Sequence, residues 1–161
     1  MAENLTRILT ERFPSGLEVL SDAPGDEAVA VGDALLLEVM TWLKGRPLDY
    51  AMLLDLTCLD ERPLGRGFTM VYHLLSLSRN HRLRVKVLLA AESPAVDSLA
   101  GLWKNADWLE REVYDMFGVV FVGHPDLRRI LMYEGFEGYP LRKDYPLRKR
   151  QPRLKERVPD A

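Results

Sequence analysis

Cysteine is nearly absent from the sequence, because Cys58 is the only one in 161 residues. A single thiol excludes disulfide frameworks, four-cysteine zinc sites and iron–sulfur clusters held by this chain alone. A reducing compartment is compatible with this composition. The hydrophobic content of 47% at this length indicates one domain of ordinary size, which can bury a core without covalent crosslinks.

Long apolar runs are also missing. No stretch approaches the roughly 20 consecutive apolar residues that span a bilayer. The N-terminal sequence MAENLTRILTERF lacks the apolar core of a secretory signal. We therefore expect a protein that is soluble or peripherally bound.

The sequence offers little from which to build a metal or nucleotide site. Its three histidines, His73, His81 and His124, have neither His-Glu-x-x-His nor His-x3-His spacing. Gly118 and Gly123 enclose the apolar VVFV, whereas the glycines of a phosphate loop precede a helix and usually a lysine. Neither kind of site is predicted.

Positive charge is concentrated near the C-terminal end. The formal net charge is −2, yet residues 142–157 hold eight Lys or Arg against Asp144 and Glu156. Such a run can bind nucleic-acid phosphates by releasing counterions. However, YPLRKDYPL carries proline and apolar residues at regular intervals, which suits an arm lying on a protein surface, and we favour that interpretation.

Hydrophobic periodicity predicts an α+β fold, a mostly antiparallel sheet with helices packed on one face. Over 82–90, apolar residues alternate with Arg84 and Lys86, as in a strand with one face in solvent. Short connections favour an antiparallel meander, because parallel neighbours need longer crossovers. The expected helices cover 5–13, 33–44 and 107–117, with short helices starting at Ser93–Pro94 and at Pro125, and the expected strands cover 17–20, 27–31, 51–59, 68–78 and 82–90.

Periodicity is lost after residue 118, where glycine, proline and charge dominate. This change predicts two parts. Residues 1–118 form the α+β domain, and residues 119–161 form an extended, basic C-terminal interaction arm.

Charged residues crowd the stretch EREVYDMFGVVFVGHPDLRRILM, residues 110–132. Glu110 and Glu112 would point about 200° apart on a helix, so they cannot act together as general acid and base. Glu112 and Asp115 share a face, but no apolar pocket is evident that would separate their pKa values. An acidic edge that faces solvent or a partner is the favoured interpretation.

The neighbours of these acids favour structural roles as well. The helix can anchor on the sheet through Trp108, Leu109, Val113, Met116 and Phe117, which leaves Arg111 and Asp115 on a more polar flank. His124 precedes Pro125, which favours extended backbone at the histidine and a helix beginning at the proline. This role is preferred to that of a ligand.

The same stretch resembles the signature of the 30-kDa-type subunit of respiratory complex I, also known as its C-type subunit. The positions that carry the resemblance are Glu110, Arg111, Glu112, Asp115, His124, Arg128 and Ile130. The sequence GFEGYPLRKDYPL, residues 135–147, is similar to a second block of that family. MLLDLTCLD and MVYHLLSLSRNHRLRVKV are similar to its central strands.

The resemblance implies a non-redox structural and assembly subunit in the peripheral arm of a proton-pumping NADH:quinone oxidoreductase, supporting electron transfer from NADH to quinone. It implies no cofactor in this chain, with flavin, iron–sulfur clusters and quinone held by partner subunits. The implied partners are the 49-kDa-type (D-type) subunit, which forms the quinone site, and the small B-type subunit, which carries a cluster. No nucleic acid is implied, and attachment to the cytoplasmic face of a bacterial inner membrane would come only through the complex.

The resemblance also implies that one set of residues serves as family motif or subunit interface, with no catalytic role. These residues are Glu110, Arg111, Glu112, Asp115, Gly118, His124, Pro125, Arg128, Arg129, Pro140, Arg142, Lys143 and Asp144. Two alternatives stay open. One is the equivalent subunit of an energy-converting membrane hydrogenase or of a quinone oxidoreductase with another electron donor, and the other is a free-standing nucleic-acid-binding domain.

Overall fold

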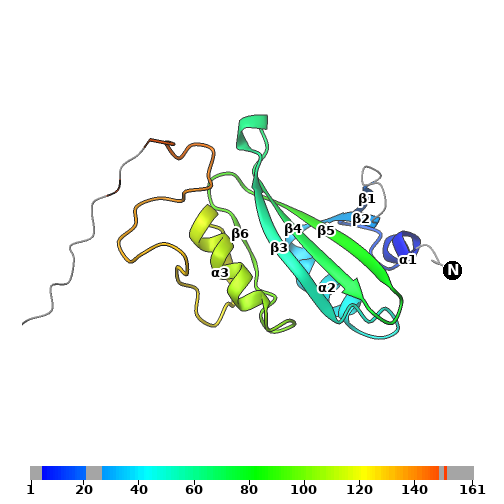
Figure 1. The fold of residues 1–161 in the computed structure, drawn as a ribbon. Coiled ribbons are helices and arrows are strands. Elements are labelled where there is room, and N and C mark those ends of the chain that lie inside the picture. The colour runs from blue at the N-terminus through cyan, green and yellow to red at the C-terminus, as the bar shows by residue number, and fades with distance from the viewer. Residues whose placement is uncertain (1–4, 21–26, 149–150, 152–161) are drawn as a thin grey trace, which may run out of the picture.

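A five-stranded sheet forms the centre of the protein (Figure 1). The computed structural model describes residues 5–20, 27–148 and 151. The strands lie in the order β1-β2-β5-β4-β3, and all neighbours are antiparallel except β2 and β5, which run parallel. Their bounds are β1 Leu17–Leu20, β2 Glu27–Val31, β3 Met52–Asp60, β4 Phe68–Ser76 and β5 His81–Leu89.

Three α-helices contribute to the same hydrophobic core as the sheet. They are α1 Leu5–Arg12, α2 Leu36–Lys44 and α3 Ala106–Phe117, and single turns of 3-10 helix occur at η1 Asp33–Leu35 and η2 Arg62–Leu64. Within the described residues, none of these helices combines the length and the apolar character needed to cross a bilayer.

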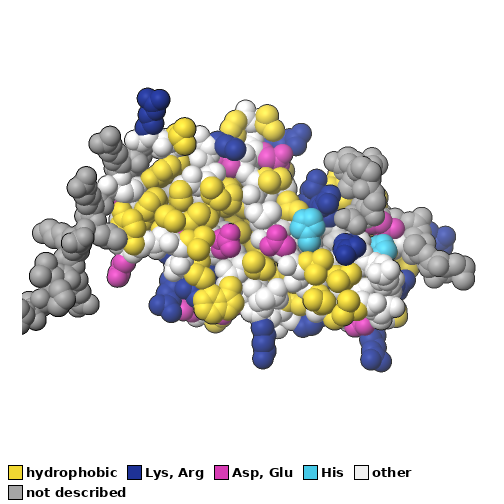
Figure 2. Space-filling model, viewed as in Figure 1, with side chains coloured by type: hydrophobic (Ala, Val, Ile, Leu, Met, Phe, Trp, Pro, Cys, Tyr) yellow, Lys and Arg dark blue, Asp and Glu magenta, His cyan; other side chains and the backbone are white. Residues whose placement is uncertain are grey.

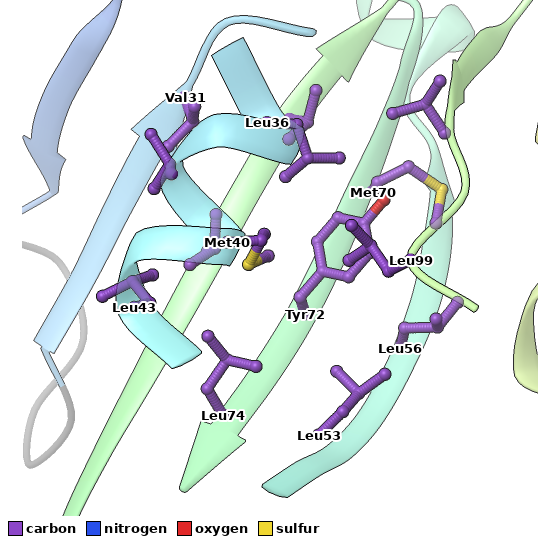
Figure 3. Close-up of a cluster of buried hydrophobic side chains, with 14 of the residues drawn as sticks. Val31, Leu36, Met40, Leu43, Leu53, Leu56, Met70, Tyr72, Leu74 and Leu99 are labelled. Carbon is purple, nitrogen blue, oxygen red and sulfur yellow. The ribbon is translucent and has the colours of Figure 1, made fainter. Parts of the chain in front are cut away.

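The centre of the core lies between α2 and the sheet. Hydrophobic residues at helical spacing form one fully buried stripe on α2, made of Leu36, Val39, Met40 and Leu43. Alternate residues of β4 face this stripe, and Figure 3 shows Tyr72 and Leu74 among them. Burial of each aliphatic side chain of this kind stabilises the fold by about 1.5–3 kcal/mol.

The sequence-based prediction of an α+β protein with a mostly antiparallel sheet is confirmed. The meander β3-β4-β5 forms as expected, and in β5 the alternating Leu83, Val85, Val87 and Leu89 are buried while Arg84 and Lys86 are partly exposed. The parallel pairing of β2 with β5 has no local signal, because α2 and two strands separate them in sequence. The division of the chain at residue 118 stays a prediction.

The short helix expected at Ser93 and Pro94 is wrong. Residues Ala95–Asp97 form β6, which pairs in parallel with β7, Val120–Val122. The backbone N–H of Val120 also donates to the carbonyl of Pro94, at 2.9 Å. Proline can stand at the start of a strand as well as of a helix. Here the segment after Pro94 is a strand because it pairs with β7, which lies more than 20 residues further along the chain.

The helix expected to start at Pro125 is also wrong. Residues 125–132 form turns and irregular backbone. The N–H groups of residues 130–132 donate to the carboxylate of Asp115, so they are not available for helical hydrogen bonds. A side chain from another element thus sets the local conformation.

Two fully buried tyrosines should respond differently to loss of the hydroxyl group. The Tyr50 hydroxyl lies 2.7 Å from Nδ1 of His81, whereas the Tyr72 hydroxyl has no hydrogen-bond partner among the described residues. Tyr50→Phe should lower the free energy of unfolding by about 1 kcal/mol, and Tyr72→Phe should leave it unchanged or raise it. Urea denaturation gives both values, and a larger loss for Tyr72→Phe would contradict the structure.

Candidate functional site

The charged motif, residues 110–132, begins on α3, whose apolar side faces the core. Most of the predicted anchors are buried or partly buried, namely Leu109, Val113, Met116 and Phe117. The anchoring predicted for Trp108 is wrong, because this side chain is 59% exposed. It lies about 200° around the helix from the buried Ala106, outside the stripe that contacts the core.

Glu110 is fully buried and fixes the segment that precedes α3. Its Oε1 accepts a hydrogen bond from the backbone N–H of Leu99, at 2.6 Å, and its Oε2 accepts one from the Ser98 hydroxyl, at 2.6 Å. Burial raises the pKa of Glu110, and these two hydrogen bonds only partly oppose that effect. Glu110 therefore holds residues 98–99 against the helix.

The imidazole ring of His124 is buried against the first turn of α3. Its Nδ1 accepts a hydrogen bond from the backbone N–H of Asp126, at 3.0 Å, which leaves Nε2 as the donor. Nε2 lies 3.1 Å from the carbonyl oxygen of Asp107 and 3.9 Å from Oε2 of Glu110. His124 thus connects the segment after β7 to α3.

Arg111 donates to two carbonyl groups of the arm. Its Nε lies 3.1 Å from the carbonyl oxygen of Arg128, and its Nη2 lies 3.4 Å from that of Arg129. The guanidinium carbon lies 5.1 Å from the centre of the Trp108 ring. The acidic edge expected to face solvent or a partner is wrong for Asp115, because the arm covers it together with Arg111 and leaves the two side chains 0% and 7% exposed.

Asp115 has more hydrogen bonds than the other acids of the motif. Its Oδ2 accepts from the backbone N–H groups of Ile130, Leu131 and Met132 at 3.0, 2.8 and 2.8 Å, and its Oδ1 accepts from Nη1 of Arg129 at 2.8 Å. Burial alone would raise the pKa of Asp115, but these donors outweigh it and lower the pKa. The carboxylate therefore fixes residues 129–132 of the arm against α3.

Gly118 ends α3 in the left-handed conformation, with φ of +73°. A Cβ at this position would lie 2.5 Å from the Tyr139 ring and 2.7 Å from the guanidinium of Arg142. Nε of Arg142 donates to the carbonyl of Phe117 at 2.5 Å, which satisfies an acceptor at the helix end. Glycine therefore allows the arm to approach the C-terminal end of α3.

Further along, the arm is fixed to the end of β3 and to η2. Oδ2 of Asp60 accepts from the backbone N–H of Lys143, at 2.8 Å. Arg62 donates to both carboxylate oxygens of Asp144, at 3.0 and 2.9 Å, and also forms an ion pair with Asp60. Hydrogen bonds from Arg62 lower the pKa of Asp60 and of Asp144.

Several of these participants were missed by sequence reasoning. Arg62 lies in DERPLGRG, which gave only a turn signal, and Ser98 gave no signal at all. Asp60 and Tyr139 lie in segments that resemble the family, but neither residue was singled out. Their roles depend on segments distant in sequence. Arg62, for example, meets Asp144 across an interval of 82 residues.

Glu112 and Arg128 do not take part in this network through their side chains. Glu112 is exposed and makes no hydrogen bond or ion pair within residues 5–20, 27–148 and 151. Arg128 is 72% exposed and pairs with Asp126 at 2.8 Å. Pro125 is exposed, and Pro140 is partly buried.

These contacts limit the chemistry that the motif can perform. In the part of the chain that the structure describes, no group of three or more His, Cys, Asp or Glu side chains could hold a metal ion. Glu110 and Asp115 already accept internal hydrogen bonds, so neither is free to serve as a general base. Burial raises the pKa of the Cys58 thiol to about 12, which makes it a poor nucleophile at neutral pH.

The fold and these contacts define an α+β domain in which buried charges fix one polypeptide segment against another. The sequence profile of the respiratory-chain NADH dehydrogenase 30 Kd subunit matches residues 29–151. The chain belongs to this family.

Individual relatives agree with this assignment. The chain is 43% identical to the C-type NADH-quinone oxidoreductase subunit of Citrifermentans bemidjiense, with 90% of this chain and 91% of that one covered. It is 44% identical to the C/D-type subunit of Pseudomonas fluorescens, with 85% and 25% covered, so it spans about a quarter of that relative. A solved trypsin-resistant fragment of Nqo5 is similar at a TM-score of 0.68 and 33% identity, with 76% and 98% covered.

The stability lost on replacing Asp115 or Glu110, the two buried acids of α3, should depend on pH in opposite directions. Asp115→Asn should lower the free energy of unfolding by about 2–4 kcal/mol at neutral pH, since an amide cannot replace the charged acceptor. The folded-state pKa of Asp115 is lowered, so its stabilisation is present above the unfolded value, about 4, and is lost as pH falls. The cost of Asp115→Asn should therefore shrink toward low pH.

For Glu110 the stability cost of substitution changes with pH in the opposite direction. Its folded-state pKa is raised, so its contribution is largest at low pH and declines as pH rises through that value. The cost of Glu110→Gln should therefore shrink toward neutral pH. Urea denaturation at several values between about pH 3 and pH 7 measures both trends, and parallel trends for the two variants would refute the assignment.

Gly118→Ala and Gly123→Ala form a matched pair. Both glycines have positive φ, +73° and +80°, so each variant carries backbone strain of about 1 kcal/mol or more. Only at Gly118 would the new methyl group collide with the arm, since nothing lies within 4 Å of a Cβ at Gly123. Gly118→Ala should therefore speed tryptic cleavage at Arg142 and Lys143, whereas equal cleavage of the two variants would argue against the close contact.

Proposed function

We propose that this chain is a non-redox structural subunit in the peripheral arm of a proton-pumping NADH:quinone oxidoreductase. It would support electron transfer from NADH to quinone without carrying electrons. The observation that carries the proposal is the internal use of the motif charges. Glu110, Arg111 and Asp115 bond to other segments of the same chain, so the motif maintains a shape that partner subunits can recognise.

Partner subunits would then supply the redox chemistry. We propose that flavin, iron–sulfur clusters and quinone are bound by them and that this chain holds no cofactor. The D-type and B-type subunits are the proposed neighbours, and the relatives of the C/D type support the former, because their name assigns both parts to one polypeptide. The proposed location is the cytoplasmic face of a bacterial inner membrane, with attachment only through the complex.

Neither alternative has comparable support. The relatives are named as NADH-quinone oxidoreductase subunits, which favours NADH as the electron donor over a hydrogenase reaction. Arg142, near the end of the arm, is engaged within the chain, because its Nε donates to the carbonyl of Phe117. A nucleic-acid partner is not part of the proposal.

Purification of the tagged full-length chain from native membranes tests this function. It should bring down the other subunits of an NADH:quinone oxidoreductase, whereas the isolated chain should be colourless and should not oxidise NADH. Asp115→Asn should lower the amount of assembled complex, while turnover per cluster stays within about twofold, because the residue acts on shape and not on chemistry. Stoichiometric iron or flavin in the pure chain, or assembled Asp115→Asn complex without quinone reduction, would overturn the proposal.

A further inference from the structure

The two edges of the five-stranded sheet differ in how their backbone groups are used. β3 forms one edge, where the carbonyls of Ala51 and Leu53 accept hydrogen bonds from the side chains of Trp103 and Asn105, at 3.1 and 2.8 Å. β1 forms the other edge, near α1 and far from the arm (Figure 1). Side chains of the same chain thus cover part of the β3 edge, whereas β1 is the edge to which a further strand can be added.

Alternate residues of β1 turn their backbone groups away from β2. The carbonyl of Gly16, the residue before β1, accepts a hydrogen bond from the residue that follows β2, at 2.8 Å. Bonded and non-bonded positions alternate along an antiparallel pair, so Glu18 and Leu20 also bond to β2, while the N–H and C=O groups of Leu17 and Val19 point outward. Among the described residues, these outward groups have no hydrogen-bond partner.

Glu18 determines which strand can bind at this edge. Its side chain is exposed and has no partner in the part of the chain that the structure describes. If two copies of β1 paired in the antiparallel register that uses both Leu17 and Val19, their two Glu18 side chains would lie directly opposite each other, which is unfavourable. A strand with lysine or arginine at that position would instead form a favourable cross-strand pair. The charge of Glu18 therefore disfavours self-association and favours a basic partner.

Val19 provides the apolar contact on the other face of β1. It opposes the fully buried Val29 in β2, yet its own side chain is 42% exposed. In the view of Figure 2, hydrophobic side chains gather most densely over α3 and the arm, away from β1. A strand bound at β1 would therefore gain most of its contacts through backbone hydrogen bonds, with one apolar side chain beside Val19.

We propose that the outer edge of β1 binds an extended segment of a partner polypeptide, which adds a further strand to the five-stranded sheet. This segment carries a lysine or arginine opposite Glu18 and, next to it in sequence, an apolar residue beside Val19. In strand addition of this kind, main-chain hydrogen bonds give affinity and alternate side chains give selectivity. The inference rests on the function proposed above, because a subunit of an assembly has polypeptide neighbours that can supply such a segment.

Amide hydrogen exchange, resolved residue by residue, tests this edge in the native complex. In the isolated chain, the N–H groups of Leu17 and Val19 should exchange at least about tenfold faster than those of Glu18 and Leu20, which bond to β2. In the complex purified from native membranes, exchange at Leu17 and Val19 should slow by about a hundredfold. Unchanged exchange at these two positions in the complex would overturn the inference. Slowing that follows the concentration of the isolated chain would do so too, because it indicates self-pairing.

Substitutions in the assembled complex give a second test. Val19→Pro removes an outward N–H but none that bonds to β2, and proline is compatible with an edge strand in this orientation. Glu18→Lys reverses the charge that the partner strand meets. Each variant should lower the fraction of chain retained on the complex after a salt wash roughly tenfold. Glu92→Lys is the matched control for charge, since Glu92 is exposed and lies outside β1, and it should be retained like the wild type.

The outcomes separate this inference from the proposed function. Urea denaturation of the isolated variants shows whether each still folds, and Glu18→Lys changes only an exposed side chain. Retention of folded Glu18→Lys and Val19→Pro at the wild-type level would refute strand addition at β1 and leave the proposed function intact. If the unmodified chain were absent from the complex, the proposed function would fail and the inference with it.

Discussion

The carboxylate of Asp115 is the interaction on which the arrangement of the C-terminal third depends. Three consecutive backbone N–H groups and one guanidinium converge on it. A helix that began at Pro125 would need the N–H groups of residues 130–132 for bonds to carbonyls four residues earlier, so their donation to the carboxylate accompanies the irregular conformation of this segment. Charge-assisted hydrogen bonds are stronger than neutral ones, and together they hold residues 129–132 of the arm against α3.

The geometry of α3 explains the different roles of the consecutive charged residues Glu110, Arg111 and Glu112. Successive residues on a helix point about 100° apart, so three neighbouring charged side chains contact three different parts of the structure. Glu110 contacts the loop before the helix, Arg111 contacts the arm, and Glu112 faces outward. Three consecutive residues of α3 thereby contact the preceding loop, the arm and the solvent.

Sequence patterns predicted the parts of this protein that local physics determines. Alternation in β5 and the apolar stripe of α2 follow from burial on one face, and both elements form as predicted. Burial of Asp115 could not be predicted in this way, because it requires donors that lie 14 to 17 residues further along the chain. The strand at Ala95–Asp97 has the same origin, since its partner, β7, follows only after α3.

The parallel contact between β2 and β5 has a consequence for the order of folding. Val29 in β2 pairs with Val85 in β5, so closing this contact encloses α2 and the two other strands of the meander. The chain entropy lost on closure grows with the length enclosed, and contacts between distant segments form late for that reason. The meander β3-β4-β5 contains only short connections and can assemble first. The N-terminal hairpin then joins an existing edge, although ribosomal synthesis delivers it before the strand to which it must bind.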